Sequence, residues 1–186
     1  MEKKTMNDIQ LIDLGLTSGT LWADRNLGAD APEQTGDYYR FGETVAFTED
    51  SPEYVCNEIE GDIAGTDRDA ATVNLGKNYR MPTLDQVKEL IYECKWKWTK
   101  QNEIKGMKVT GPNGNSIFLP ASGSPANFNS SFGYVGSYGY CWSASPYNSC
   151  YGYYLGIGSR YRNWYNGNRA NAFPIRAVAG EFTIKH

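Results

Sequence analysis

The chain has 186 residues, of which 40% are hydrophobic and 21% charged, and its formal net charge is −3. This length, without a low-complexity linker, predicts a single domain over residues 1–186 that buries enough surface to fold without disulfide support. The mild charge argues against a nucleic-acid partner. The polar start at Met1–Gln10 and the lack of long apolar runs argue against a signal peptide and against membrane insertion.

Charge is unevenly distributed along the chain. No acidic residue lies between Glu103 and Glu181. The basic residues of this stretch are Lys105, Lys108, Arg160, Arg162, Arg169 and Arg176. A basic binding surface and simple charge compensation on a folded monomer both account for this pattern. Calcium requires carboxylate ligands, so we expect binding through this part of the chain to need no calcium.

The beginning of the chain predicts two short strands and a helix. An apolar run at Ile9–Leu14 has strand character, and a second strand resumes at Thr20–Ala23 after a turn that contains Gly and Ser. Ala31–Gln34, with Pro in its first turn, predicts a short helix that ends near Gly36. Three aromatic residues that follow are expected to pack inward: Tyr38, Tyr39 and Phe41.

The segment Glu43–Asp69 is acidic and shows no periodicity. Calcium binding is one interpretation. However, Glu60–Gly65 lacks the alternating oxygen ligands of an EF-hand loop, so we expect a solvated loop. Asp67–Leu75 then predicts a helix, with Gly76 placed as its C-terminal cap.

The clearest helix signal begins at Thr83. Thr83–Gln86 forms a capping box, and apolar residues recur at helical spacing over Leu84–Cys94, so one face of this helix should be buried. From Trp96 the period changes, because Trp96 and Trp98 alternate with lysines as in a half-buried strand.

Several more strands are predicted after this helix. Gly106–Thr110 and Ser116–Leu119 are joined by a turn over Gly111–Gly114. Ala121–Phe132 is rich in Ser, Asn and Gly and predicts a loop. Three aromatic residues then alternate with small residues in another strand: Tyr138, Tyr140 and Trp142. Two or three short helices, several antiparallel strands and long irregular loops indicate an α+β domain.

The segment Tyr153–Gly158 gives a prediction that depends on strand parity, because alternate side chains point to opposite faces. The residues expected to face the core are Tyr153, Leu155 and Ile157. Those expected to open onto a ligand are Tyr154, Gly156 and Gly158. Trp164 should form another wall beside Tyr154. Ser159–Asn171 has no period and is expected to be a long loop, and Phe173–Val178 is expected to be the final strand.

The segment Gly133–Asn171 contains nine of the chain's 14 tyrosines, with Gly, Ser, Asn and Arg between them and no Asp, Glu or Lys. Tyr and Trp give large contact area at low side-chain entropy, and Ser, Gly and Asn add adaptable hydrogen bonds, as in antibody paratopes. The segment therefore indicates a recognition surface. The alternative is an ordinary Tyr-rich sheet, since Tyr is a good strand former.

The four cysteines fit neither a dense disulfide framework nor a CxxC metal site. Cys94 falls in the helical pattern and is expected to be buried as a small hydrophobe. Cys141 and Cys150 could face each other across a hairpin, but spacing alone leaves their pairing open.

Several motifs together resemble C-type-lectin-like domains of Bacteroidetes surface and phage proteins, a fold shared with formylglycine-generating enzymes. The similar segments are Asp13–Ala23, Gly36–Tyr39, Phe41–Glu43, Asp69–Asn74, Tyr79–Thr83, Gly114–Ala121, Gly139–Ser145 and Arg169–Val178. The last segment departs from the family pattern at Ala172 and Pro174. The resemblance implies a scaffold over about residues 9–132, a variable ligand-binding region over about 133–172 and a closing strand at 173–179.

Some of these relatives are variable proteins of diversity-generating retroelements, in which adenines of a template repeat are mutated during copying into the gene. Asn codons then become Tyr, Ser, Gly, Cys or Arg codons, among others, but not Lys, Glu, Gln or Met codons. This chain has none of those four residue types from Val109 to Gly180, as such a cassette implies. Trp164 is not reachable from a mutated Asn codon and must be templated otherwise.

The resemblance also raises an enzymatic alternative. Formylglycine-generating enzymes bind copper through a closely spaced cysteine pair, whereas Cys141 and Cys150 are farther apart, and nothing else in the sequence supports a soft metal. A calcium-dependent lectin site needs carboxylates, which the C-terminal half lacks. We therefore expect no enzymatic activity, no cofactor and no metal.

The sequence thus predicts a binding module for a protein or glycan ligand on a cell surface, in adhesion or phage host recognition, carried on a bacterial surface or a phage virion. The residues expected to contact the ligand are Tyr147, Asn148, Tyr151, Tyr154, Gly156, Gly158, Arg160, Tyr161, Arg162, Asn163, Trp164, Tyr165, Asn168 and Asn171. The aromatic residues serve as anchors and the arginines as hydrogen-bond donors. The alternative is a structural domain of a surface or virion assembly, an oligomer that uses the same face as a subunit interface.

Overall fold

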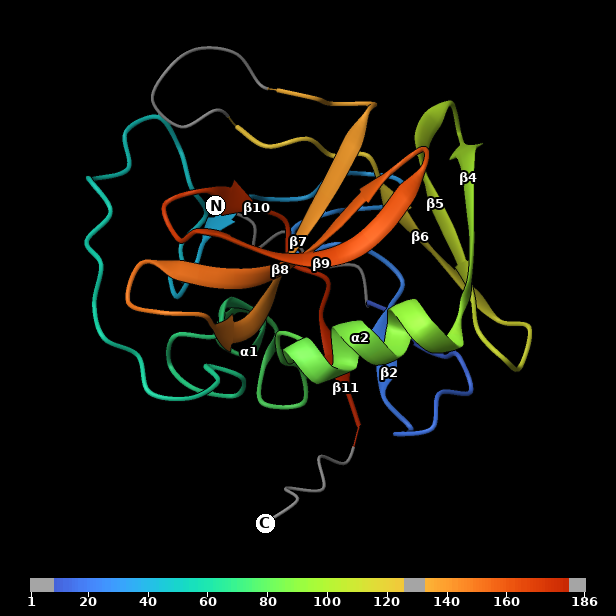
Figure 1. The fold of residues 1–186 in the computed structure, drawn as a ribbon, viewed down its shortest axis with the longest axis horizontal. Helices are drawn as coiled ribbons and strands as arrows, with labels where there is room; N and C mark the ends of the chain where they lie inside the picture. The colour runs from blue at the N-terminus through green and yellow to red at the C-terminus, as the bar shows by residue number, and fades with distance from the viewer. Residues whose placement is uncertain (1–8, 126–132, 181–186) are drawn as a thin grey trace, which may run out of the picture.

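The structure is a computed structural model and describes residues 9–125 and 133–180. In this part of the chain, two short helices accompany four small antiparallel sheets (Figure 1). This arrangement confirms the α+β class. The predictions made for residues 1–8 and for residues 126–132 of the Ala121–Phe132 loop lie outside the described residues.

The first and last strands of the described chain meet in one sheet. β1 (Leu11–Asp13), β2 (Leu21–Ala23) and β11 (Val178–Ala179) pair in the order β1-β2-β11. Both strands predicted near the start of the chain are confirmed. The pairing of β2 with β11 also ties the two ends of the domain together.

The helix predicted at Ala31–Gln34 is wrong, because these residues form a turn. The Gln34 amide donates to the Ala31 carbonyl at 3.1 Å. Gly36 then reverses the chain with φ at +73°, and a Cβ at this position would lie 2.4 Å from the Leu27 carbonyl oxygen. The chain turns back against its own preceding segment before a helix can extend, and only Gly fits there.

β3 (Tyr39–Arg40) pairs with β10 (Ala172–Phe173). Tyr39 and Phe41 are buried, as predicted. Tyr38 is half-buried, and its hydroxyl donates to a backbone carbonyl of the segment after β6 at 2.7 Å.

The predicted final strand Phe173–Val178 is divided in two, since β10 ends at Phe173 and β11 begins at Val178. Pro174 has no N–H to continue a ladder. The carbonyls of Ile175 and Ala177 between the two strands still accept hydrogen bonds from the β2 region, at 2.8 and 2.9 Å.

α1 (Ala70–Leu75) follows the acidic segment Glu43–Asp69, which contains neither helix nor strand. Most of this segment is the predicted loop, but Ile63 and Asp69 are buried and not solvated. Asp69 is the N-cap, so the helix begins three residues later than expected. One Asp69 carboxylate oxygen accepts from two amides of the first helical turn at 2.8 and 3.1 Å, and the other accepts from the Met81 amide at 2.9 Å. Gly76 caps the helix C-terminus as predicted.

α2 (Leu84–Glu93) confirms the predicted long helix and its capping box. The Thr83 amide donates to the Gln86 side-chain oxygen at 2.9 Å, and the Gln86 amide donates to the Thr83 hydroxyl at 3.2 Å. Its buried face consists of Val87, Leu90 and Ile91.

β4 (Lys95–Gln101), β5 (Ile104–Thr110) and β6 (Ser116–Pro120) form the second three-stranded sheet in the order β4-β5-β6. All three strands were predicted. Trp96 and Trp98 are half-buried against the core, while Lys95 and Lys97, which alternate with them, are exposed.

β7 (Tyr138–Pro146), β8 (Tyr151–Gly158) and β9 (Tyr161–Asn168) form the third such sheet, in the order β7-β8-β9. The long loop predicted at Ser159–Asn171 is therefore wrong, because β9 pairs with β8 along its whole length through a two-residue turn. The β8–β9 hairpin lies alongside α2 (Figure 1).

Two clusters of buried side chains form the core. The first joins α2 to the β4–β6 and β7–β9 sheets and includes Leu90, Val109 and Leu155. The second joins β3, β7 and β10 and includes Trp142 and Phe173. The β7–β9 sheet thus contributes side chains to both clusters and is packed against the rest of the domain.

Arg176 has no exposed surface. Its guanidinium donates to the Asn26 side-chain oxygen at 2.8 Å and to the carbonyls of Ala23 and Phe118 at 3.1 and 2.7 Å. Burial lowers the pKa of Arg176 to about 10. Arg169 is also fully buried. Two of the basic residues that the sequence placed in a basic stretch are therefore structural and add nothing to a binding surface.

Candidate ligand-binding surface on the β8–β9 hairpin

β9 is the outer strand of its sheet among the described residues. Directly opposed residues of an antiparallel pair project to the same face, so the β8–β9 register divides the hairpin into two faces. The front face carries Tyr154, Gly156, Gly158, Tyr161, Asn163 and Tyr165. The back face carries Tyr153, Leu155, Ile157, Arg162, Trp164 and Asn166.

The inner part of the front face belongs to the core. Trp142 is fully buried, and its ring centroid lies 4.5 Å from that of Phe173 and 5.9 Å from that of Tyr154. Tyr140 stacks on Phe173 with centroids 4.8 Å apart and planes inclined by 14°. Phe173 of β10 therefore covers the inner end of the front face. The Tyr154 ring lies between these core rings and the surface.

Four tyrosines continue the front face outward, and we call them the tyrosine row: Tyr134, Tyr138, Tyr161 and Tyr165. Successive ring centroids are 5.1, 5.9 and 6.2 Å apart. Tyr134 is 64% exposed and Tyr165 is 40% exposed, and the two middle residues are half-buried. Burial, with a smaller effect of neighbouring tyrosines, raises the pKa of Tyr161 to about 12. The row is a partly exposed succession of neighbouring aromatic rings, which crosses the sheet from Tyr138 on β7 to Tyr161 on β9 and then follows β9 to Tyr165.

Gly156 and Gly158 do not open onto a ligand, contrary to the prediction. A Cβ on Gly158 would lie 2.6 Å from the Tyr161 ring and 3.1 Å from the Tyr138 ring. A Cβ on Gly156 would lie 3.1 Å from the Tyr165 ring. Both glycines are buried because the rings pack down onto the bare backbone. They support the tyrosines instead of contacting a ligand.

The back face of the hairpin is directed toward the core. Leu155 and Ile157 on this face are buried, as the parity prediction stated. Tyr153 is only half-buried. Trp164 lies on this face, packs against the first core cluster and has its ring centroid 5.9 Å from that of Tyr153. The prediction that Trp164 forms a wall beside Tyr154 is therefore wrong, because the two rings are on opposite faces.

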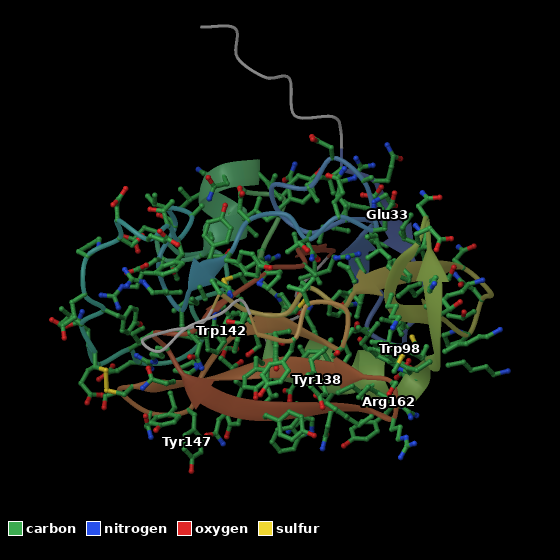
Figure 2. The ribbon with its side chains drawn as sticks, turned by 90° about the horizontal axis from the view of Figure 1, so that it is seen from above. Glu33, Trp98, Tyr138, Trp142, Tyr147 and Arg162 are labelled. Atoms are coloured by element: carbon green, nitrogen blue, oxygen red, sulfur yellow. A yellow bond between two sulfur atoms is a disulfide. The ribbon has the colours of Figure 1, made fainter. Side chains whose placement is uncertain are left out.

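The exposed part of the back face is cationic. Arg162 is exposed, and the Lys88 ammonium of α2 lies 4.7 Å from the centroid of the Trp164 ring. Figure 2 shows Arg162 and Tyr147 at opposite ends of the same side of the molecule, with Trp142 in the interior. The strand residues of the front face, in contrast, include no charged side chain.

The turn between β7 and β8 extends the exposed surface beyond the hairpin. Tyr147 is 54% exposed and Tyr151 is 40% exposed. The Asn148 side-chain oxygen accepts from the amides of Cys150 and Tyr151 at 3.0 and 2.9 Å. Asn148 thus fixes the turn that presents the two rings.

Cys150 forms a disulfide with Cys56, 94 residues earlier, with a Cα–Cα distance of 5.1 Å. The alternative pairing of Cys150 with Cys141 does not occur. Cys94 and Cys141 are free and buried, and burial raises the pKa of each thiol to about 11. The disulfide fastens the acidic segment Glu43–Asp69 to the β7–β8 turn and is visible as a yellow bond at the edge of the molecule (Figure 2).

Arg169 makes a second connection between the same segments. Its guanidinium donates to the Asn57 carbonyl at 2.9 Å and to the Tyr151 carbonyl at 3.2 Å, and lies 5.0 Å from the centroid of the Phe41 ring. Its amide donates to the Cys150 carbonyl at 2.8 Å. Arg169 and the disulfide together hold the base of the hairpin.

The structure places the predicted contact residues on the β8–β9 hairpin, where they are divided between its two faces, and in the segments that adjoin it. The exposed ones are Tyr147, Asn148, Tyr151, Arg160, Arg162, Asn163, Tyr165 and Asn168. The half-buried ones are Tyr154, Tyr161, Trp164 and Asn171. The sequence analysis missed Tyr138 as the ring neighbour of Tyr161 and Tyr134 as the ring neighbour of Tyr138. The alternation at Tyr138 predicted a strand, but only the register shows which residues lie across from it.

Residues 9–125 and 133–180 contain no group of three or more His, Cys, Asp or Glu side chains placed to hold a metal ion. None of the helices in these residues is long and apolar enough to cross a membrane. Comparisons of the chain with protein-family models, with curated proteins and with solved structures found no match.

Proposed function

We propose that the chain is a non-enzymatic ligand- or receptor-binding module with a C-type-lectin-like fold. Its β8–β9 hairpin and β7–β8 turn would recognise a protein or glycan on a cell surface, in adhesion or phage host recognition. The main support is the division of the Tyr-rich segment into buried residues that build the sheet and exposed Tyr, Asn and Arg residues along one strand and one turn. Such residues dominate binding hot spots and paratopes.

The proposal includes diversification of this surface by a retroelement. Trp164, which a mutated Asn codon cannot produce, packs against the core as a scaffold residue does. Asn163 and Tyr165 on either side of it are exposed. A neighbouring near-copy of the 3′ coding region that differs only at adenines, beside a reverse transcriptase gene, is the expected genomic finding.

The proposed setting is a bacterial surface or a virion. The Cys56–Cys150 disulfide supports it, because such bonds persist in oxidising surroundings. The main alternative is a subunit interface within a surface assembly. The outer edge of β9 supports that alternative, since β9 pairs only with β8 among the described strands and edge strands readily pair with another chain.

Binding of the labelled chain to a panel of intact bacterial cells, read by flow cytometry, tests the proposal. The hairpin variant combines Tyr151→Ser, Asn163→Ser, Tyr165→Ser and Asn168→Ser. The control variant changes exposed residues elsewhere, Val55→Ser, Val73→Ser, Tyr92→Ser and Ile104→Ser. We expect the chain and the control to label at least one strain, and the hairpin variant to label it at least about tenfold less. Equal labelling by the hairpin variant, or no labelling of any strain, contradicts the proposal.

Sedimentation of the same three proteins distinguishes ligand recognition from the alternative role as a subunit interface. A stable oligomer that dissociates in the hairpin variant, together with no cell labelling, supports an assembly role. A monomer at all concentrations, with labelling lost in the hairpin variant, supports recognition.

A further inference from the structure

We infer that the tyrosine row, Tyr134, Tyr138, Tyr161 and Tyr165, binds an uncharged oligosaccharide, with sugar rings packed on the tyrosine rings. This inference rests on the proposed function and names the ligand class of the front face. Three properties of the row support it: its shape, its exposed area and its lack of charge.

The row offers several neighbouring rings in succession, first across the sheet and then along β9, which suits a ligand built of several linked rings. The planes of Tyr138 and Tyr161 in the middle are inclined by only 35°. Tyr134 and Tyr165 at the two ends stand steeply to their neighbours, at 74° and 82°. A ligand packed on the middle rings therefore meets a differently oriented ring at each end. The negative face of an aromatic ring attracts the partly positive C–H groups that cover one side of a sugar ring.

The exposed area is too small for a typical protein partner. A stable protein–protein interface takes about 800 Å² from each side, whereas a whole Tyr side chain contributes about 150–250 Å² when it is buried. Tyr138 and Tyr161 are already half-buried, and Tyr165 is only 40% exposed. The row on its own can cover a few sugar units but falls short of a protein interface.

The charge distribution selects a neutral ligand. The strand residues on the front face are uncharged, and Arg162 projects to the opposite face of the same strand. Tyr hydroxyls donate and accept hydrogen bonds, and the exposed Asn163 amide lies between Tyr161 and Tyr165 on the front face. Sugar hydroxyls match these groups. The exposed Arg160 precedes Tyr161 in the β8–β9 turn, outside the strands, so an acidic ligand would find no cation among the strand residues of the front face.

The row is also held in place before a ligand arrives. Gly156 and Gly158 lie directly beneath the rings of Tyr165 and Tyr161, and the Tyr154 centroid is 5.9 Å from that of Tyr165. Rings packed on the sheet lose little further conformational freedom on binding, which favours affinity.

An array of neutral and acidic oligosaccharides, probed with the full chain, tests the inference. The variants Tyr161→Ser and Tyr165→Ser each remove one ring, and Tyr165→Phe keeps the ring. Arg162→Ser removes the exposed cation on the opposite face of β9. Lys97→Ser, which removes an exposed cation on β4 away from the hairpin, is the control. We expect binding to neutral members, a loss of about tenfold or more in the variants Tyr161→Ser and Tyr165→Ser, and little change in Tyr165→Phe and Lys97→Ser. Binding should persist in about 1 M salt, which screens charge–charge contacts. Thermal melting checks that each variant is folded, and Tyr165→Ser decides the test if Tyr161→Ser does not fold.

Labelling of cells pretreated with periodate or with protease tests the ligand class and the proposed function separately. Periodate cleaves the vicinal diols of sugars, and protease removes surface proteins. Hairpin-dependent labelling that is lost after periodate supports the inference. Hairpin-dependent labelling that survives periodate and is lost after protease overturns the carbohydrate ligand and leaves the proposed function standing. Array binding confined to acidic members, or binding abolished by Arg162→Ser but not by Tyr165→Ser, overturns the tyrosine row as the site.

Discussion

The ring of Tyr161 packs onto Gly158, the residue paired with it across the β8–β9 hairpin, so that a Cβ on Gly158 would lie 2.6 Å from the ring. A side chain at position 158 must therefore displace the ring. This contact explains a glycine in the last position of β8, where glycine otherwise weakens a strand.

Gly158→Ala should lower the free energy of unfolding by about 1–3 kcal/mol, the usual cost of overpacking, measured by urea denaturation. The double variant Gly158→Ala/Tyr161→Ser provides the control. With the Tyr161 ring absent, the cost of the alanine should fall by about 1 kcal/mol, as expected for residues in contact. An equal cost with and without the ring would show that the contact does not constrain position 158.

The cysteines give a prediction that thiol counting can check. Native protein near neutral pH should react with no alkylating reagent, because the free Cys94 and Cys141 are buried with pKa values raised to about 11 and the thiolate is the reactive form. Unfolded protein should show two thiols, and unfolded, reduced protein four. Four thiols in unfolded, unreduced protein would mean that the disulfide is absent.

Removing the disulfide should loosen the base of the hairpin. The Cys56→Ser/Cys150→Ser variant should be about 2–5 kcal/mol less stable, the range for native disulfides that close long loops. Cys141→Ala, which removes a buried free thiol and no cross-link, is the comparison. If limited proteolysis cuts the acidic segment Glu43–Asp69 no faster in the double variant than in the parent chain, the disulfide does not hold that segment in place.

The buried Arg176 should matter far more than an exposed arginine. Arg176→Met leaves the acceptors on Asn26, Ala23 and Phe118 without their donor in the core, and each buried unpaired group costs about 1–3 kcal/mol. We expect a loss of about 3 kcal/mol or more in thermal or urea unfolding. Arg162→Met, on the surface of β9, should change stability by less than about 0.5 kcal/mol. Similar losses in both variants would place the two side chains in similar surroundings, against the structure.

Chelation should have no effect. No acidic residue lies between Glu103 and Glu181, and calcium sites are built from carboxylate and carbonyl oxygens. Melting temperature and cell labelling are therefore expected to be the same with and without EDTA. A marked fall of either on chelation would reveal a bound cation that takes part in folding or binding.

The elements that the sequence predicted correctly are those defined by local signals. α2 has a capping box at Thr83 and a 3.6-residue apolar period, and β4 has Trp96 and Trp98 alternating with lysines. Each signal is contained within a few residues, so no knowledge of the tertiary structure is needed to read it.

The features that the sequence did not predict depend on distant contacts. β9 carries large or polar side chains on both faces, so Tyr161–Asn168 has no hydrophobic alternation to mark a strand. The Cys56–Cys150 pair spans 94 residues. Arg169 and Arg176 are buried because backbone carbonyls elsewhere in the chain accept their hydrogen bonds. A charged residue in the sequence gives no sign of such partners.

The parity prediction shows which features of the site a local sequence pattern can predict. It correctly predicted that Leu155 and Ile157 are buried and that Tyr154 lies on the other face. It could not show that rings from β9 cover Gly156 and Gly158, because that requires the register between two strands.

In the proposed function, the exposed hairpin residues serve binding and contribute little to folding. Saturation mutagenesis of the whole chain, displayed on a cell or phage surface and sorted once for protease resistance and once for cell labelling, tests it most directly. Scaffold positions such as Trp22, Leu90, Trp142 and Phe173 should fail the first sort, since truncating a buried large side chain costs about 2–5 kcal/mol. We expect the four positions changed in the hairpin variant, Tyr151, Asn163, Tyr165 and Asn168, to pass the first sort with most substitutions, and changes among them to fail the second. If these positions fail the first sort as often as the scaffold does, or pass both sorts freely, the hairpin is not a binding surface.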